Sequence, residues 1–368
     1  RLGYCYYVGK GIREDKREAV KWYRLAADQG NAEAQWRLGY CYYVGKGIRE
    51  DKREAVKWYR LAAGQGNAEA QRRLGYCYYV GKGIREDKRE AVKWYRLAAG
   101  QGNAEAQWRL GDFYFWGEGI REDKQEAVKW YRLAADQGNA EAQRRLGYCY
   151  FWGEGIREDK QEAVKWYRLA ADQGNAEAQR RLGYFYFWGE GIREDKQEAV
   201  KWYRLAADQG NAEAQRRLGY CYFWGEGIRE DKQEAVKWYR LAADQGNAEA
   251  QRRLGYFYFW GEGIREDKQE AVKWYRLAAD QGNAEAQWRL GDCYFFGHGV
   301  GKNKREAVNW YFLSAEKGNA EAQRRLGACF YFGHGVAKNR QEAIRWYRLA
   351  AEQGNSVAIS MLKKLGVM

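Results

Sequence analysis

Hydrophobic and polar residues along this chain follow a helical period, and the complete pattern restarts every 36 residues. In the copy at residues 31–66, the segment AEAQWRLGYCYYV predicts a helix that begins after the N-cap residue Asn31 and ends at Gly45. A second helix is predicted to begin at Asp51, the first residue of a D-x-x-E capping box, and to end before Gly66. We call these helix A and helix B, and each repeat is expected to be one A–B pair.

Each predicted helix has one apolar face. On helix A, Ala34, Leu38, Gly39 and Tyr42 fall on the same side when residues are placed at 100° steps. On helix B, the apolar positions are Ala55, Val56, Trp58, Tyr59, Ala62 and Ala63. Helices of this length are marginal in isolation, so each repeat must bury its apolar faces against its neighbours. The pattern therefore predicts an all-α solenoid of helix–turn–helix repeats.

Ten such repeats are predicted to form one continuous array over residues 1–360, because no linker separates them. The repeats begin at residues 1, 37, 73, 109, 145, 181, 217, 253, 289 and 325. The segment SVAISMLKKLGVM then departs from the repeat and predicts a C-terminal capping helix, which begins near residue 356 and ends within residues 361–368. The first repeat lacks the NAEAQ segment that precedes every later repeat, which indicates a truncated or processed start.

Two motifs recur along the chain. The first runs from Leu38 and Gly39 through Tyr42 to Ile48 in the form L-G-x-x-Y-x-x-G-x-G-I, and the second covers residues 51–66 in the form D-x-x-x-A-x-x-W-Y-x-x-A-A-x-x-G. The first eight repeats keep these forms, and the last two keep them with a few substitutions, such as Val300 for Ile and Asn303 for Asp. Together they resemble the Sel-one-like repeat (SLR), a relative of the tetratricopeptide repeat. The resemblance implies a right-handed α/α superhelix with the A helices on its concave side, and a role as an adaptor or scaffold in signalling, protein quality control or bacterial host interaction. One bacterial subgroup, linked to β-lactam binding, has two cysteines per repeat and is not matched by this chain.

Composition and charge limit the classes of function. With 46% hydrophobic and 17% aromatic residues the chain is not disordered, and no apolar run reaches the roughly 18–20 residues of a membrane-spanning helix. The net charge of +14 is concentrated at the ends, because the first three repeats carry +2, +4 and +3 whereas the five middle repeats carry −1, 0, 0, 0 and −1. A nucleic-acid groove is expected to be basic along its length, so nucleic acid is not a favoured partner.

All seven cysteines occupy one position of the repeat, at which the other three repeats carry Phe. They are Cys5, Cys41, Cys77, Cys149, Cys221, Cys293 and Cys329. A position that accepts Cys or Phe needs an apolar side chain, and packed helices stand about 8–10 Å apart, which is too far for a disulfide. Free, buried thiols are therefore predicted, which favours a reducing compartment such as the cytoplasm. Because the start looks truncated, secretion stays open.

The sequence predicts no catalytic, cofactor or metal site. The carboxylates recur in capping positions, and catalysis needs a unique, preorganised group of residues. The G-K-G and G-E-G loops lack the preceding strand and third glycine of a dinucleotide site, and more plausibly end helix A and turn the chain into helix B. The two histidines, His298 and His334, share one loop position, which does not suit a metal site. The chain is expected not to be an enzyme.

Three positions of helix A, those of Trp36, Tyr40 and Val44, vary most between repeats, whereas the predicted core positions tolerate the least change. On the helical wheel they lie within about 80° of one another, opposite the predicted core. The candidate partner-binding residues are Trp36, Tyr40, Arg72, Trp108, Trp116, Arg144, Trp152, Arg180, Trp188, Trp224, Trp260 and Trp288. Trp, Tyr and Arg dominate interface hot spots, although such an aromatic stripe can equally pack between successive A helices.

The sequence thus predicts a non-enzymatic scaffold that binds a protein or peptide of unknown identity along this face. A second hypothesis is a binder of an extended polymer, polysaccharide or single-stranded nucleic acid, on a ladder of aromatic rings. A third is a structural repeat that self-associates, or a designed array without a ligand. Near-identity of the middle repeats fits recent duplication and design equally well.

Overall fold

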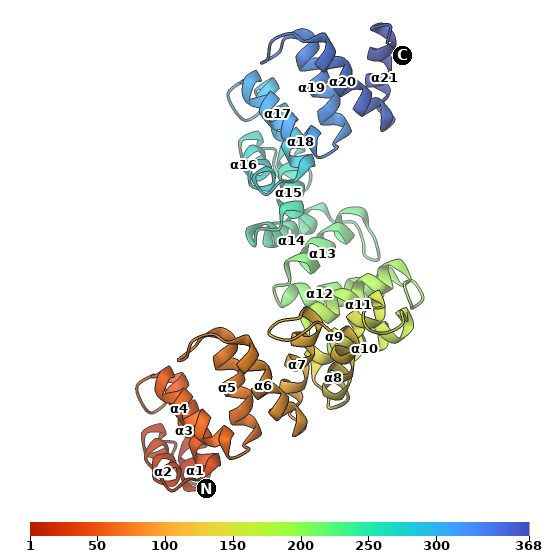
Figure 1. Cartoon of the computed structure of the whole chain (residues 1–368). Helices are drawn as coiled ribbons and strands as arrows, with labels where there is room; N and C mark the ends of the chain where they lie inside the picture. The colour runs from red at the N-terminus through yellow and green to blue at the C-terminus, as the bar shows by residue number, and fades with distance from the viewer. Residues whose placement is uncertain (368) are drawn as a thin grey trace. The chain divides into compact units, whose positions relative to one another are not determined.

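The computed structural model describes residues 1–367, and within that range every regular element is an α-helix (Figure 1). The A helices are α1 (Leu2–Val8), α3 (Ala32–Val44), α5 (Ala68–Val80), α7 (Ala104–Trp116), α9 (Ala140–Trp152), α11 (Ala176–Trp188), α13 (Ala212–Trp224), α15 (Ala248–Trp260), α17 (Ala284–Phe296) and α19 (Ala320–Phe332). The B helices are α2 (Lys16–Asp28), α4 (Lys52–Gly64), α6 (Lys88–Gly100), α8 (Lys124–Asp136), α10 (Lys160–Asp172), α12 (Lys196–Asp208), α14 (Lys232–Asp244), α16 (Lys268–Asp280), α18 (Lys304–Glu316) and α20 (Arg340–Glu352). A last helix, α21 (Ser356–Lys364), follows. The prediction of an all-α solenoid of helix pairs is confirmed, and the handedness of a superhelix stays a prediction.

Local capping interactions set the helix boundaries. The side chain of Asn67 accepts a hydrogen bond from the main-chain N–H of Ala70 (2.8 Å), and that of Asp51 accepts one from Glu54 (2.9 Å). Helix α3 ends at Gly45, whose φ of 71° lies in the left-handed region that favours glycine. The cap residues expected from the sequence therefore begin and end the helices.

A buried tyrosine of helix B fills the space beside a glycine of helix A in each repeat. Tyr59 is fully buried against Gly39, and a Cβ atom at Gly39 would lie 2.8 Å from the Tyr59 ring. Leu38 and Ala55 are also fully buried. The helices of a pair approach closely because this glycine has no side chain, and the tyrosine ring fills the remaining volume. Within each of the chain's two compact units, helix B then packs on helix A of the next repeat, so that the core continues from one repeat to the next, as from α4 to α5.

Buried glutamines connect successive repeats. The Nε2 atom of Gln143 donates a hydrogen bond to the main-chain oxygen of Ala135 in the preceding helix α8 (3.1 Å). Its Oε1 atom accepts one from Gln173, at the end of the following B helix α10 (2.7 Å). The same contacts recur at Gln35, Gln71 and Gln107. The glutamine is part of the core although it is polar, because both ends of its amide have partners.

The chain divides into two compact units. One comprises Arg1–Ala178 with Glu190–Arg193, and the other comprises Gln179–Gly189 with Glu194–Met368. Within each unit, helices pack mainly on helices that are adjacent in the sequence. In the second unit, α21 packs on the last repeat through Ala358 and Leu362, which are buried. Its role as a cap stays a prediction.

The cysteine side chains are free, and six of the seven are buried. The prediction that all seven are buried is wrong for Cys5, which is half-buried, because it lies on α1 and no preceding B helix covers that helix in the structure. Burial raises the pKa of Cys41 to about 11 and that of Cys149 to about 12. A thiol is the reactive nucleophile only as a thiolate, so the buried cysteines are unreactive at neutral pH.

We expect a maleimide reagent to label Cys5 alone in the folded protein at pH 7 and all seven cysteines after unfolding in urea. Intact-mass spectrometry counts the labels. A Cys5→Ser variant, as the control, should take up none while folded. Labelling of Cys149 as fast as Cys5, or recovery of a native disulfide, would contradict this assignment.

Candidate functional site

Five exposed tryptophans stand at the C-terminal ends of consecutive A helices. They are Trp116, Trp152, Trp188, Trp224 and Trp260, and each is 55–56% exposed. The first two belong to one compact unit and the other three to the second. An exposed tryptophan is unusual on a folded surface, and five at the same repeat position form a regular feature. We call these five residues the tryptophan row.

Each tryptophan of the row is held by neighbouring rings. The Phe151 ring meets Trp152 edge-to-face at 4.8 Å between centroids, and the ring of Tyr148, one helical turn earlier, lies 6.4 Å from Trp152. The same pair of contacts holds Trp224. The tryptophan side chain is thus held by these rings on one side and exposed to solvent on the other. Fixed, open aromatic rings lose little entropy when a partner covers them.

The loop after each tryptophan connects to the preceding repeat. Glu118, two residues after Trp116, forms an ion pair with Lys88 at the start of helix α6 (3.1 Å). Glu262 forms the same pair with Lys232 (2.9 Å). The carboxylates next to the row are therefore partly neutralised within the chain.

The structure corrects the helical-wheel prediction for the position of Trp36. Trp108 and Trp288 occupy this position in their repeats and are only 6% and 8% exposed. Trp108 belongs to a hydrophobic cluster that includes Ala142 and Leu146 of the next A helix, α9. The same cluster contains Ala127 and Tyr131 of the repeat's own helix B, α8, so this side of helix A belongs to the core rather than to the open surface. Trp36 itself is half-buried.

The arginines predicted for the site are engaged within their own helices. Arg72 donates hydrogen bonds to Glu69 through Nε (2.9 Å) and Nη2 (2.5 Å), and Arg144 binds Glu141 in the same way. Arg180, on α11, is half-buried. The guanidinium groups of Arg72 and Arg144 are therefore already paired with carboxylates of their own helices. The tryptophan row is the exposed part of the predicted binding face.

The position of Tyr40 carries a ring in seven repeats and none in the other three. Tyr40 contacts Trp36 edge-to-face (6.2 Å), and the Arg73 guanidinium lies over the Tyr40 ring (5.3 Å). Asp112, Asp292 and Ala328 replace the tyrosine.

Asp112 forms a polar network of its own. Tyr131 donates a hydrogen bond to its Oδ1 atom (2.6 Å), and Arg145 of the next A helix donates one to its Oδ2 atom (3.1 Å). Burial raises the pKa of the Asp112 carboxyl group, whereas Arg145 and the Tyr131 hydroxyl act in the opposite direction. Asp292 repeats the arrangement with Tyr311 (2.5 Å) and Arg325 (2.8 Å).

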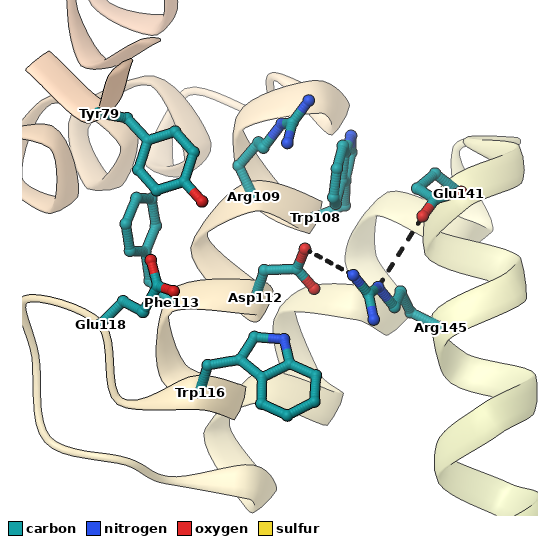
Figure 2. A pocket seen from close by; sticks show the side chains of 9 residues that line it. All are labelled: Tyr79, Trp108, Arg109, Asp112, Phe113, Trp116, Glu118, Glu141 and Arg145. Carbon is teal, nitrogen blue, oxygen red and sulfur yellow. Dashed lines mark hydrogen bonds and ion pairs between the residues drawn. The ribbon is translucent and has the colours of Figure 1, made fainter. Parts of the chain in front are cut away.

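A cavity of about 440 Å³ opens beside Asp112 (Figure 2). Trp116 and Asp112 line one part of it, and Tyr79 of the preceding repeat lies across from them. Arg145 lies between Asp112 and Glu141, 3.9 Å from the latter. The sequence shows that the position of Tyr40, which Asp112 occupies in its repeat, is variable, but it does not reveal the cavity. The signal for the cavity is that this position lacks the aromatic ring that seven other repeats carry.

No cluster of three or more His, Cys, Asp or Glu side chains among residues 1–367 is arranged to hold a metal ion. None of the helices in the described part of the chain is long and apolar enough to cross a membrane.

The helix pairs and the repeated surface residues define an α-solenoid repeat protein. The chain belongs to the Sel1 repeat family, whose model matches residues 1–31, 32–67, 68–103, 104–139, 140–175, 176–211, 212–247, 248–283, 284–319 and 320–355. The resemblance inferred from the motifs is thereby confirmed.

Two solved structures are similar in sequence and fold. A protective antigen of uropathogenic Escherichia coli with an SLR fold is 35% identical with a TM-score of 0.87, and the alignment covers 99% of this chain and 78% of the antigen. A Sel1 repeat protein from Oxalobacter formigenes is 32% identical with a TM-score of 0.64, covering 84% of this chain and 90% of that protein. The comparison with curated proteins finds no match.

Proposed function

We propose that this protein is a non-enzymatic scaffold that holds a protein or peptide partner against the tryptophan row. Sel1 repeat proteins are generally protein-interaction scaffolds. The observation that carries the finer proposal is the exposure of five ring-supported tryptophans at one position of consecutive repeats. Tryptophan is the side chain most enriched at interface hot spots, and a fixed ring binds at a low entropic cost.

The charges beside the row favour a protein over a polyanion. Each tryptophan is followed by a loop glutamate, such as Glu118 and Glu262, and the lysines close to these glutamates are paired with them. A phosphate backbone would meet carboxylates at each step, whereas a peptide with apolar and basic side chains would not. A polysaccharide or single-stranded nucleic acid remains an alternative outcome of the binding test.

We expect the triple variant Trp152→Ala, Trp188→Ala, Trp224→Ala to weaken partner binding at least tenfold, since each hot-spot truncation costs about 2 kcal/mol or more. Its free energy of unfolding should fall by only about 1 kcal/mol per residue, because the rings are mostly exposed. Partners are captured from the native cell on the immobilised protein, identified by mass spectrometry and then titrated at 50 and 200 mM salt.

The matched control is the triple variant Leu169→Ala, Leu205→Ala, Leu241→Ala. These leucines are 47–48% exposed and lie on the B helices, so the control removes similar apolar surface outside the row. It should retain binding. Equal loss of binding in both variants would contradict the proposal, and a loss of affinity of about 10³-fold or more between the two salt concentrations would favour a nucleic acid.

A further inference from the structure

The cavity beside Asp112 occupies the place that a tyrosine ring fills in other repeats. In the next repeat, Tyr148 packs between the Phe115 ring of the preceding repeat (6.0 Å) and Trp152 (6.4 Å). One repeat earlier, the corresponding walls are Tyr79 and Trp116, and both line the cavity. Asp112 has no ring to place between them. The cavity is therefore a vacant ring position.

The repeat at residues 248–262 provides a template for the missing ring. Its helix A and loop differ from those at residues 104–118 at two positions, where Arg252 and Tyr256 replace Trp and Asp. The Tyr256 hydroxyl donates a hydrogen bond to Oε1 of the loop residue Glu262 (2.8 Å). The other carboxylate oxygen of Glu262, Oε2, accepts from Lys232.

The cavity preserves the hydrogen-bonding partner of that ring. Glu118 corresponds to Glu262, lines the cavity and is paired through Oε2 with Lys88. The Oε1 atom of Glu118 corresponds to the atom that accepts the tyrosine hydroxyl in the template. The site thus has the equivalents of the two aromatic walls that hold Tyr148 and of the carboxylate oxygen that accepts the hydroxyl of Tyr256.

The two other repeats without this tyrosine fill the space in another way. The ring of His298, from the loop, packs on Phe259 of the preceding repeat (5.6 Å), and the ring of His334 packs on Phe295 (5.6 Å). The cavity beside Asp292 is accordingly smaller, at about 180 Å³. The loop residue beside Asp112 is a glutamate, so a ring-sized space is left there.

We propose that the cavity beside Asp112 binds a tyrosine side chain of the partner, which takes the place of the missing ring. Its volume of about 440 Å³ is ample, since a protein cavity of about 150 Å³ already admits benzene. The ring lies between Tyr79 and Trp116, and its hydroxyl group donates to Glu118. This rests on the proposed function, because it assigns one anchor point of a peptide bound at the A-helix surface.

The test uses N-acetyl-tyrosinamide as the probe and saturation-transfer NMR on the full chain. We expect saturable binding with a roughly millimolar dissociation constant, as suits a single side chain. Asp112→Tyr fills the cavity with the ring of the template and should weaken binding at least tenfold. Asp292→Tyr, the matched control, makes the same change in the other repeat and should leave binding unchanged.

Two further comparisons make the result decisive. N-acetyl-phenylalaninamide lacks the hydroxyl group and should bind several-fold more weakly, and equal binding would overturn the assignment of tyrosine. Trp116→Ala, which removes one wall, should also abolish binding, so the test stands even if Asp112→Tyr does not fold. Absence of saturation, or equal binding by Asp112→Tyr, would overturn the proposal.

Failure of the cavity proposal can be distinguished from failure of the proposed function. The triple tryptophan variant leaves Tyr79, Trp116 and Glu118 intact, so it should bind the probe as the unsubstituted chain does. Loss of partner capture with retained probe binding supports both proposals. Retained capture in that variant overturns the tryptophan row without affecting the cavity.

Discussion

Deleting residues 217–252, one complete repeat, should leave a folded and shorter protein, whereas deleting only residues 217–234 should abolish cooperative folding of the array around the cut. The whole-repeat deletion joins Arg216 to Arg253, at the same point of helix A in both repeats. It restores a helix with the sequence AEAQRRLGYFYFW, identical to that of α15. The half-repeat deletion joins Arg216, in the first half of α13, to Ala235, in the first turn of α14, and removes the loop between them.

The different results follow from contacts between neighbouring repeats. After the whole-repeat deletion, Gln281 can donate to Gln215 as it does to Gln251, and Glu262 can pair with Lys196 as it does with Lys232. The free energy of unfolding should therefore fall only by the contribution of one repeat and of one interface between repeats. The half-repeat deletion leaves a helix that is mostly of type B directly after the B helix α12, where a helix A should pack. Tyrosines that are buried in the intact protein, such as Tyr239, then become exposed. A loss above about 5 kcal/mol is expected, because several core residues lose their contacts together.

Urea unfolding followed by circular dichroism at 222 nm measures both deletions. The whole-repeat variant should keep the helical signal per residue and a single transition. The half-repeat variant should lose helical signal and broaden the transition. Similar tolerance of the two deletions would show that the A–B pair is not the folding unit.

Much of the fold could be predicted because its signals are local and repeated. Asn31 and Asp51 cap helices within a few residues of themselves, and Gly45 ends a helix by its own conformation. Helices pack mainly on their sequence neighbours, so the 36-residue period fixes which surfaces meet. No long-range pairing had to be inferred.

Which residues of helix A are exposed was harder to predict, because a helical wheel treats one isolated helix as having only a core side and a solvent side. Helix A has neighbours on more than one side, so Trp108 is buried in a cluster that includes residues of both α8 and α9, although the wheel places it opposite the core of its own repeat. Gln143 is polar yet buried, because its partners are main-chain and side-chain groups of other helices. The cavity beside Asp112 depends on the rings of two repeats, Tyr79 and Trp116, and no single repeat shows it.

From the second repeat onward, the second glycine of the G-x-G loop marks another contact that the sequence does not reveal. Gly155 has a φ of 70°, which favours glycine, and the sequence accounts for it as part of a turn. The structure adds that a Cβ atom at Gly155 would overlap the main-chain carbonyl group of Lys124 and lie 2.9 Å from the Gln125 nitrogen. These atoms belong to the first turn of α8, in the preceding repeat. The loop of one repeat therefore rests directly on the backbone of another.

Gly155→Ala should consequently be among the most destabilising single substitutions in the chain, with a loss of about 3–5 kcal/mol from left-handed strain and overpacking combined. Gly138→Ala is the matched control, because Gly138 has a φ of 87° and a Cβ atom there would meet nothing within 4 Å. It should show the strain alone, about 1–2 kcal/mol. Urea titration gives both values. Equal losses of unfolding free energy in the two variants would mean that the loop can move away from α8 without cost. Glycine would then be needed at residue 155 only for the turn conformation.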